Sequence, residues 1–219
     1  MRIEKGETLA VIGKNGSGKS TLLRIIAGIY PATRGHVQLN GRLAAVLELG
    51  TALHPELPGI DNIVIYGALL GLSRKEIKQR MDAIVAFSGL GNFIDMPMKH
   101  YSSGMQMRLA LSVALHTEPD IMAVDEGLAT GDEEFRVQVK QRIRQYCEAG
   151  GTLILVTHFA EDALFYCARG LLLEQGCLTM DGEIRSVLRA YGALPTVSME
   201  ENKKHGGRKM ILGNKNHIL

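Results

Sequence analysis

The pattern Gly-x-x-x-x-Gly-Lys-Ser runs from Gly13 to Ser20 and constrains the fold more than any other feature of the sequence. The apolar run Thr8-Leu-Ala-Val-Ile12 precedes this pattern and predicts a buried strand. The segment from Lys19 to Gly28 follows it and combines good helix formers with apolar residues, which predicts a helix packed on a sheet. A strand, a glycine-rich turn and a helix in this order indicate an α/β fold with a mostly parallel sheet.

The same pattern predicts a phosphate site. Its glycines let the backbone turn so that successive N–H groups point at phosphate oxygens, and the helix beginning at Lys19 presents its positive end there. We expect Lys19 to reach the β and γ phosphates and Ser20 to ligate Mg²⁺. An ordinary glycine-rich turn is the alternative, but it gives no reason for a Lys-Ser pair at a buried corner. The predicted nucleotide-binding residues are Gly13, Lys14, Asn15, Gly16, Ser17, Gly18, Lys19, Ser20 and Thr21.

Two further strand signals end in polar residues. Ile121-Met-Ala-Val124 is followed by Asp125, which can hold the Mg²⁺ water shell, and by Glu126, which can polarise an attacking water. Thr152-Leu-Ile-Leu-Val-Thr157 is followed by His158, whose ring can reach a γ-phosphate. A lone histidine more often has a structural role. We favour a catalytic role here, because the carboxyl ends of parallel strands meet at the edge where ligands gather.

The first half of the chain carries signals for a hairpin and two helices. Residues 36–40 and 43–48 flank the dipeptide Asn40-Gly41 and predict two strands joined by a tight turn. Asp61 is the expected N-cap of a helix over 62–70. Ser73 is the expected N-cap of a second helix, so this region forms a helical insert.

The second half alternates helix and strand signals. A helix is predicted over about 133–148, ending at Gly150-Gly151. A hairpin over 170–174 and 177–180 and a helix over 182–191 follow. Residues 192–219 have no usable periodicity and predict a polar, mobile tail, with a basic lipid-binding patch as the alternative.

Composition narrows the class of protein. Lys plus Arg number 25 against 23 for Asp plus Glu, and a formal charge of +2 does not indicate nucleic acid. The scattered cysteines, Cys147, Cys167 and Cys177, predict reduced structural thiols rather than a metal site. The longest apolar run, 63–72, is shorter than the roughly 20 residues that cross a bilayer. With no signal-peptide pattern at the start, we expect a cytosolic protein.

The segment Tyr101-Ser-Ser-Gly-Met-Gln-Met-Arg108 precedes an apolar helix signal and resembles the signature Leu-Ser-Gly-Gly-Gln of the ABC family. Ser102 and Gly104 match that signature, whereas Tyr101, Ser103 and Met105 replace Leu, Gly and Gln. A serine-rich helix cap without a ligand is the alternative for this segment alone. Because it lies after the phosphate pattern and before the twin carboxylates, the chain is identified as similar to ABC ATPases over about 4–180.

The resemblance implies an ABC-type P-loop NTPase domain over 1–191, with a helical subdomain at about 58–118. It implies ATP and Mg²⁺ as cofactors and a homodimer in which Ser102, Ser103 and Gly104 bind the ATP of the opposite protomer. Family members carry antiparallel strands upstream that stack an aromatic ring on adenine. We therefore expect those strands to be truncated here, or the start codon to be misplaced.

The resemblance extends to the D-loop of the family, but the glutamine of a second family loop is missing. Asp132, six residues after Glu126, matches the acidic residue of the D-loop that crosses the dimer interface. The glutamine that senses the membrane partner in the family is absent from residues 47–55, and Glu48 and His54 are both candidates to replace it.

Three segments together are similar to ATPases that export capsule, O-antigen or teichoic acid: 47–50, 95–109 and 125–135. This likeness implies a peripheral subunit at the cytoplasmic face of the bacterial inner membrane, paired with an integral permease. Some of these ATPases carry a C-terminal glycan-binding domain, and we expect none here because the segment after Tyr191 is too short for a packed domain. The apolar helix expected at 62–72 is then a permease contact, or equally buried core. The alternatives are a soluble ABC ATPase acting on nucleic acid or ribosomes, and a degenerate subunit that does not hydrolyse ATP.

Overall fold

The computed structural model describes residues 1–47, 53–125 and 132–194. Their strands form one sheet in the order β2-β3-β4-β1-β5-β6, in which only the β5–β6 pair is antiparallel. The strands are β1 (Thr8–Ile12), β2 (Leu43–Val46), β3 (Ile121–Asp125), β4 (Thr152–Val156), β5 (Arg169–Glu174) and β6 (Cys177–Glu183). This arrangement confirms the predicted α/β fold with a mostly parallel sheet.

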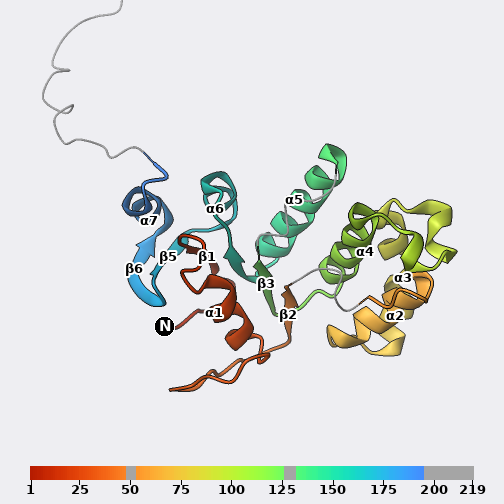
Figure 1. Ribbon diagram of the computed structural model, residues 1–219, viewed down its shortest axis with the longest axis horizontal. Coiled ribbons are helices and arrows are strands. Elements are labelled where there is room, and N and C mark those ends of the chain that lie inside the picture. Colours follow the sequence, from red (N-terminus) through yellow and green to blue (C-terminus); the bar gives the residue numbers. More distant parts are fainter. Residues whose placement is uncertain (48–52, 126–131, 195–219) are drawn as a thin grey trace, which may run out of the picture.

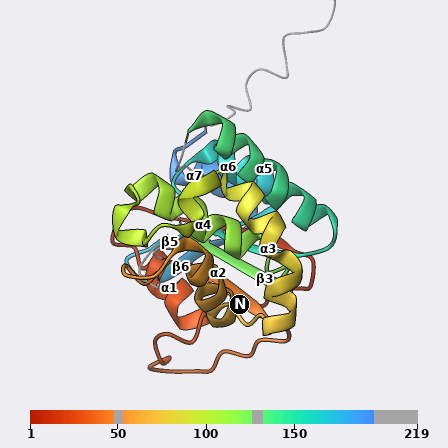
Figure 2. The ribbon, with the colours of Figure 1, turned by 90° about the vertical axis from the view of Figure 1, so that its right-hand side faces the viewer.

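The helices cover the sheet unequally (Figure 1). One helix, α1, lies on one face of the sheet, and α5, α6 and α7 lie on the other, while α2, α3 and α4 stand together beyond β2 (Figures 1 and 2). The α-helices are α1 (Lys19–Ile26), α2 (Gly59–Leu69), α3 (Arg74–Ser88), α4 (Ser103–Leu115), α5 (Glu133–Glu148), α6 (Ala160–Tyr166) and α7 (Ile184–Tyr191). None of the helices in the described parts of the chain is long and apolar enough to span a membrane.

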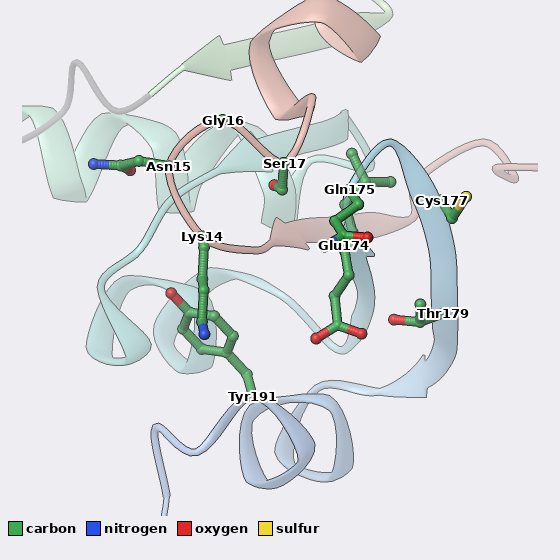
Figure 3. A pocket seen from close by; sticks show the side chains of 10 residues that line it. Lys14, Asn15, Gly16, Ser17, Glu174, Gln175, Cys177, Thr179 and Tyr191 are labelled. Carbon is green, nitrogen blue, oxygen red and sulfur yellow. The ribbon is translucent and has the colours of Figure 1, made fainter.

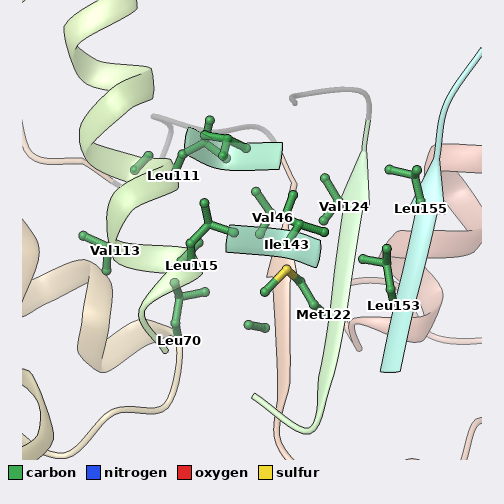
Figure 4. Packing of buried hydrophobic residues seen from close by; sticks show 14 of the residues in the cluster. Val46, Leu70, Leu111, Val113, Leu115, Met122, Val124, Ile143, Leu153 and Leu155 are labelled. Carbon is green, nitrogen blue, oxygen red and sulfur yellow. The ribbon is translucent and has the colours of Figure 1, made fainter. Parts of the chain in front are cut away.

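Side chains of the central strands point alternately to the two faces of the sheet and contribute to a hydrophobic core on each face. In β1, Leu9 and Val11 pack with Leu23 of α1, whereas Ala10 and Ile12 belong to the cluster on the opposite face. Successive side chains of a strand point to opposite faces, so a continuous apolar run is needed where both faces are covered. Figure 4 shows the larger core, where Met122, Val124, Leu153 and Leu155 of the sheet meet Leu111 and Leu115 of α4 and Ile143 of α5.

Side chains cap the starts of two helices, and the cap at Ser73 was predicted from the sequence. Ser73 caps α3 and forms a capping box, because its side chain accepts from the N–H of Glu76 and the Glu76 side chain accepts from the Ser73 N–H. Asp132 caps α5, with its side chain accepting from the N–H of Phe135.

The predicted N-cap of α2 is wrong. The helix begins at Gly59 after Pro58, and Asp61 lies inside its first turn. The reason is Asn62, whose buried amide nitrogen donates to the carbonyls of Leu57 and Pro58 and so extends the helix start backward along the chain.

The predicted hairpin around Asn40-Gly41 is also wrong. Residues 36–40 form no strand, and β2 pairs with β3 in parallel. Gly41 instead has φ +125°, and the following N–H, of Arg42, donates to the carboxylate of Asp120 at 2.8 Å. The turn residues therefore attach the start of β2 to the loop before β3 rather than to a preceding strand.

Candidate nucleotide site

The loop between β1 and α1 is shaped by two of its glycines. A Cβ on Gly13 would lie 2.3 Å from the carbonyl oxygen of Leu173, so only glycine fits beside β5. Gly18 is the N-cap of α1 with φ +102° and supplies no side-chain hydrogen bond to the helix start. The first N–H groups of α1 therefore have no side-chain cap and face the loop, the arrangement that binds phosphate at helix N-termini.

Lys19 occupies the centre of this loop. Its side chain is buried, and its ammonium group donates to the carbonyl oxygens of Gly13 at 2.9 Å and Lys14 at 3.2 Å. The N–H of Gly176, in the β5–β6 turn, donates to the carbonyl oxygen of Ser17 at 2.9 Å and supports the loop from behind. A positive charge held inside a ring of backbone groups is suited to a phosphate.

A cavity of about 600 Å³ lies beside the loop, between it, the β5–β6 turn and the end of α7. Lys14, Asn15 and Ser17 line it from the loop, and Glu174 and Tyr191 line it from β5 and α7 (Figure 3). The hydroxyl of Ser17 is buried without a hydrogen-bond partner in the described parts of the chain. The loop thus offers a polar group that a ligand can pair with.

The strand register brings the other predicted residues to the same edge of the sheet. Asp125, the last residue of β3, is opposite Val156 of β4, which is in turn opposite Val11 of β1. His158 follows β4 and is exposed, with its ring centroid 3.9 Å from that of Phe159 and the two rings inclined at 38°. The phosphate loop, Asp125 and His158 are therefore neighbours across three adjacent strands. Glu126 lies outside the described residues.

The segment resembling the signature forms the start of α4. Ser102 is the N-cap, with its hydroxyl accepting from the N–H of Met105 at 3.2 Å, and Ser103 and Gly104 are exposed in the first turn. The departure at Tyr101 has a structural cause, because this buried side chain donates from its hydroxyl to the carbonyl oxygen of Phe93 at 2.5 Å. Within one chain, this segment belongs to the helices beyond the edge strand β2, whereas the phosphate loop follows β1, three strands farther along the sheet (Figure 1).

Of the two candidates to replace the family's glutamine, the structure describes only His54. Glu48 lies outside the described residues. His54 is attached to α2, because its N–H donates to the side-chain oxygen of Asn62 at 2.6 Å and its carbonyl oxygen accepts from the Asn62 amide at 3.1 Å. Sequence reasoning passed over Asn62; the available signal was a single amide inside an otherwise apolar helix.

Asp132 does more than cap α5. Its second carboxylate oxygen lies 3.3 Å from a guanidinium nitrogen of Arg108 in α4. Sequence reasoning gave no role to Arg108, the last residue of the segment that resembles the signature. Arginines are common on helices, and nothing in the local pattern marked this one.

Comparison with known proteins agrees with this geometry. Residues 1–129 match the ABC transporter family. An O-antigen export ATP-binding protein of Myxococcus xanthus is 46% identical over 87% of this chain, and one of Klebsiella pneumoniae is 44% identical over 86%. A teichoic acids export ATP-binding protein of Enterococcus faecalis is 40% identical over 87%. The chain spans 44%, 77% and 42% of the lengths of these three relatives, respectively.

Solved structures give the same result. An ATP-binding subunit of an ABC transporter superimposes with a TM-score of 0.77 at 25% identity, covering 88% of this chain and 85% of that one. A bacterial ABC transporter cassette, solved as a dimer, gives a TM-score of 0.71 at 25% identity, covering 84% of this chain and 88% of that one. The matched sequence family, the relatives and the shared fold together establish that this chain belongs to the ABC transporter family.

Proposed function

We propose that the chain binds and hydrolyses ATP as a subunit of an exporter of lipid-linked surface polysaccharide, of the capsule, O-antigen or teichoic acid class. The observation that carries the ATP part is the sheet edge where the phosphate loop, Asp125 and His158 meet. The export part is supported by the likeness to O-antigen and teichoic acid export proteins.

In this proposal the phosphate loop, Gly13 to Thr21, holds the ATP phosphates. Lys19 pairs with the β and γ phosphates, because its ammonium group already lies at the centre of the ring of loop carbonyls. The Ser20 hydroxyl and the Asp125 carboxylate are hard oxygen donors of the kind that Mg²⁺ prefers, so these two residues fit a Mg²⁺ bound with the phosphates.

Hydrolysis requires a group that orients water at the γ-phosphate. We assign this role to Glu126, which directly follows Asp125 in the sequence, and assign contact with the γ-phosphate to His158. Both assignments are predictions that rest on chain position at the carboxyl ends of β3 and β4.

A second copy completes the site. The N-terminus of α4, with Ser102, Ser103 and Gly104, is exposed and presents N–H groups, yet lies away from the phosphate loop of its own chain. Two copies facing each other would place each α4 start on the phosphates bound by the other. We therefore propose a homodimer with two shared ATP sites, in which Asp132 belongs to the interface.

Helix α2 supports the proposed membrane partner. Its Ile63 and Tyr66 are buried, whereas Val64, Ile65 and Leu69 are exposed, so one helix both completes the core and presents apolar surface. Exposed apolar patches mark contact sites. We propose that this face contacts the permease, which places the chain at the cytoplasmic face of the inner membrane. The near-neutral composition gives no support to a nucleic-acid partner.

Phosphate release from Mg-ATP by the purified chain tests the enzymatic part, with Glu126→Gln as the inactive variant. We expect the substitution to reduce the turnover number by at least about a hundredfold, the usual contribution of a general base. A wild-type chain that releases no phosphate, alone or with its membrane partner, would contradict the proposal.

Loss of surface polysaccharide on deletion of the gene tests the export part. The wild-type gene should restore the glycan, and the gene for Glu126→Gln should not. Normal surface glycan in the deletion strain would remove the export part while leaving the ATPase intact.

A further inference from the structure

Arg108 connects the signature helix to the start of α5. It lies in the second turn of α4, and its guanidinium carbon is 4.7 Å from the ring centroid of Phe135 in α5. Its Nη1 lies 3.3 Å from Oδ2 of Asp132, the N-cap of the same helix. Stacking and an ion pair therefore act together on one arginine, a combination that lysine cannot reproduce.

Asp132 divides its two carboxylate oxygens between the two helices. Oδ1 accepts from the N–H of Phe135 at 2.9 Å and caps α5, while Oδ2 faces Arg108 of α4. A short side chain that serves both partners fixes the distance between them. If α4 and α5 moved separately, one of the two bonds would break.

Two helices pack around Arg108. Phe135 is fully buried and packs against Phe87 of α3, with ring centroids 5.6 Å apart. A Cβ on Gly89, at the end of α3, would lie 3.5 Å from Nη2 of Arg108. Arg108 of α4 is thus partly buried between Phe135 of α5 and the C-terminal end of α3.

Packing alone does not explain an arginine here. Its Nε is buried and has no hydrogen-bond partner among residues 1–47, 53–125 and 132–194. A buried donor without a partner costs free energy that an apolar side chain of the same length would avoid. We infer that this cost is offset by the contacts of the guanidinium group with Asp132 and Phe135.

We propose that Arg108 is a positioning residue that makes the signature turn and the end of the D-loop move as one unit. This inference rests on the proposed function, in which Ser102 to Gly104 and Asp132 both face the second copy. When both segments have one fixed spacing, a second copy meets a preformed surface. Loss of Arg108 should then weaken ATP-driven pairing of the two copies and leave the affinity of a single phosphate loop for ATP unchanged.

The experiment uses the full chain carrying Glu126→Gln, in which the ATP-bound dimer is expected to persist. Arg108→Met keeps the length of the side chain and removes its charge. Asp132→Asn keeps an N-cap oxygen for Phe135 and removes the charge that faces Arg108. Arg144→Met is the matched control, because Arg144 forms an exposed i,i+4 ion pair with Glu148 on the same helix.

Analytical ultracentrifugation measures the dimer dissociation constant with ATP, and a fluorescent ATP analogue measures nucleotide affinity in dilute, monomeric protein. We expect Arg108→Met and Asp132→Asn each to raise the dimer dissociation constant at least about fivefold. The double variant should be no weaker than the weaker single variant, because both remove the same contact. Nucleotide affinity should stay at the parent value, and Arg144→Met should match the parent in both measurements.

Three results would overturn the inference. Unchanged dimerisation of both variants would show that the contact positions nothing. Additive effects in the double variant would show that the two residues act separately, and equal losses of nucleotide affinity and dimerisation would show general loosening of the fold. If Arg108→Met does not fold, Arg108→Gln, which also removes the charge, takes its place in both the single and the double variant. A parent chain that does not dimerise with ATP would refute the proposed function itself, and the inference with it.

Discussion

At the scale of single residues, the phosphate loop depends on two kinds of glycine. Gly13 lies where the carbonyl oxygen of Leu173 leaves no room for a Cβ. Gly16 has open space around it and is required only by its φ of +79°. Steric exclusion and backbone strain are therefore separable within one loop.

Replacing these glycines by alanine should separate the two effects. Gly16→Ala should cost about 1–2 kcal/mol, the strain of a left-handed alanine. Gly13→Ala should cost more and should also reduce ATP affinity, because β5 or the loop must move. Urea unfolding measures the first effect and nucleotide titration the second. Equal destabilisation by the two substitutions would contradict the close approach of β5.

His116 makes the stability of the folded chain depend on pH. Burial lowers its pKa below the ordinary 6.5, although its Nδ1 lies 2.7 Å from the carbonyl oxygen of Ser112, which favours the charged form. The unfolded chain therefore binds a proton below about pH 6.5 that the folded chain binds less readily. The free energy of unfolding should fall as the pH drops from 6.5, by at most about 1.4 kcal/mol per pH unit.

The variant His116→Phe should lose this dependence, because phenylalanine keeps a ring against Phe87 and does not titrate. Urea unfolding at pH 7.5, 6.5 and 5.5 gives the comparison. The lowered pKa values of the Glu7 and Asp181 carboxyls affect stability only at more acidic pH, so they do not interfere. Identical slopes for the variant and the wild type would exclude His116 as the cause.

At the scale of single residues, the sequence predicted contacts that form within short motifs. The position of Lys19 in its loop and the cap made by Ser73 could be read from the sequence, because both depend on neighbours within a few residues. The hydroxyl bond of Tyr101 and the stacking of Arg108 on Phe135 could not, because they join segments whose proximity only the folded chain creates.

At the scale of elements, α2 combines two surfaces that the sequence leaves as alternatives. Ile63 is fully buried, whereas Leu69 is 65% exposed. The helix is therefore core on one side and exposed apolar surface on the other, and its uniform apolar composition hides this division.

Substitutions on the two sides of α2 should have opposite consequences. Ile63→Ala should lower the free energy of unfolding by about 2–5 kcal/mol, because it opens a cavity. Leu69→Gln should change it by less than about 0.5 kcal/mol, leave ATP hydrolysis by the isolated chain unchanged, and reduce co-purification with the permease. Full retention of the permease by Leu69→Gln would argue against α2 as the contact.

Local sequence signals predicted an element best where its hydrogen bonds are formed within the element itself. The N-cap of α3 involves only residues of its own first turn, and Ser73 was predicted to form it. The strand expected at 36–40 failed because a strand requires a partner, and Gly41 turns the chain toward Asp120 instead. Helix α6 was not predicted, since its seven residues are too few for a clear period.

At the scale of the whole molecule, the residues proposed to bind phosphate lie at one edge of the sheet. The segment resembling the signature lies at the start of α4, in the group of helices beyond β2 (Figure 1). Alternating strand and helix signals were sufficient to predict this class of fold. They were insufficient to bring the two proposed halves of the site together, because in the proposed dimer these halves come from different copies of the chain.

Complementation between two inactive variants tests this shared site most directly. Lys19→Met removes the phosphate contact of one copy, and Gly104→Asp places a negative charge at the signature turn. In a mixed dimer, one site joins an intact phosphate loop to an intact signature. The account predicts that each variant alone has almost no ATPase activity and that their mixture recovers a substantial fraction of the wild-type rate. A mixture as inactive as its components would contradict the shared site.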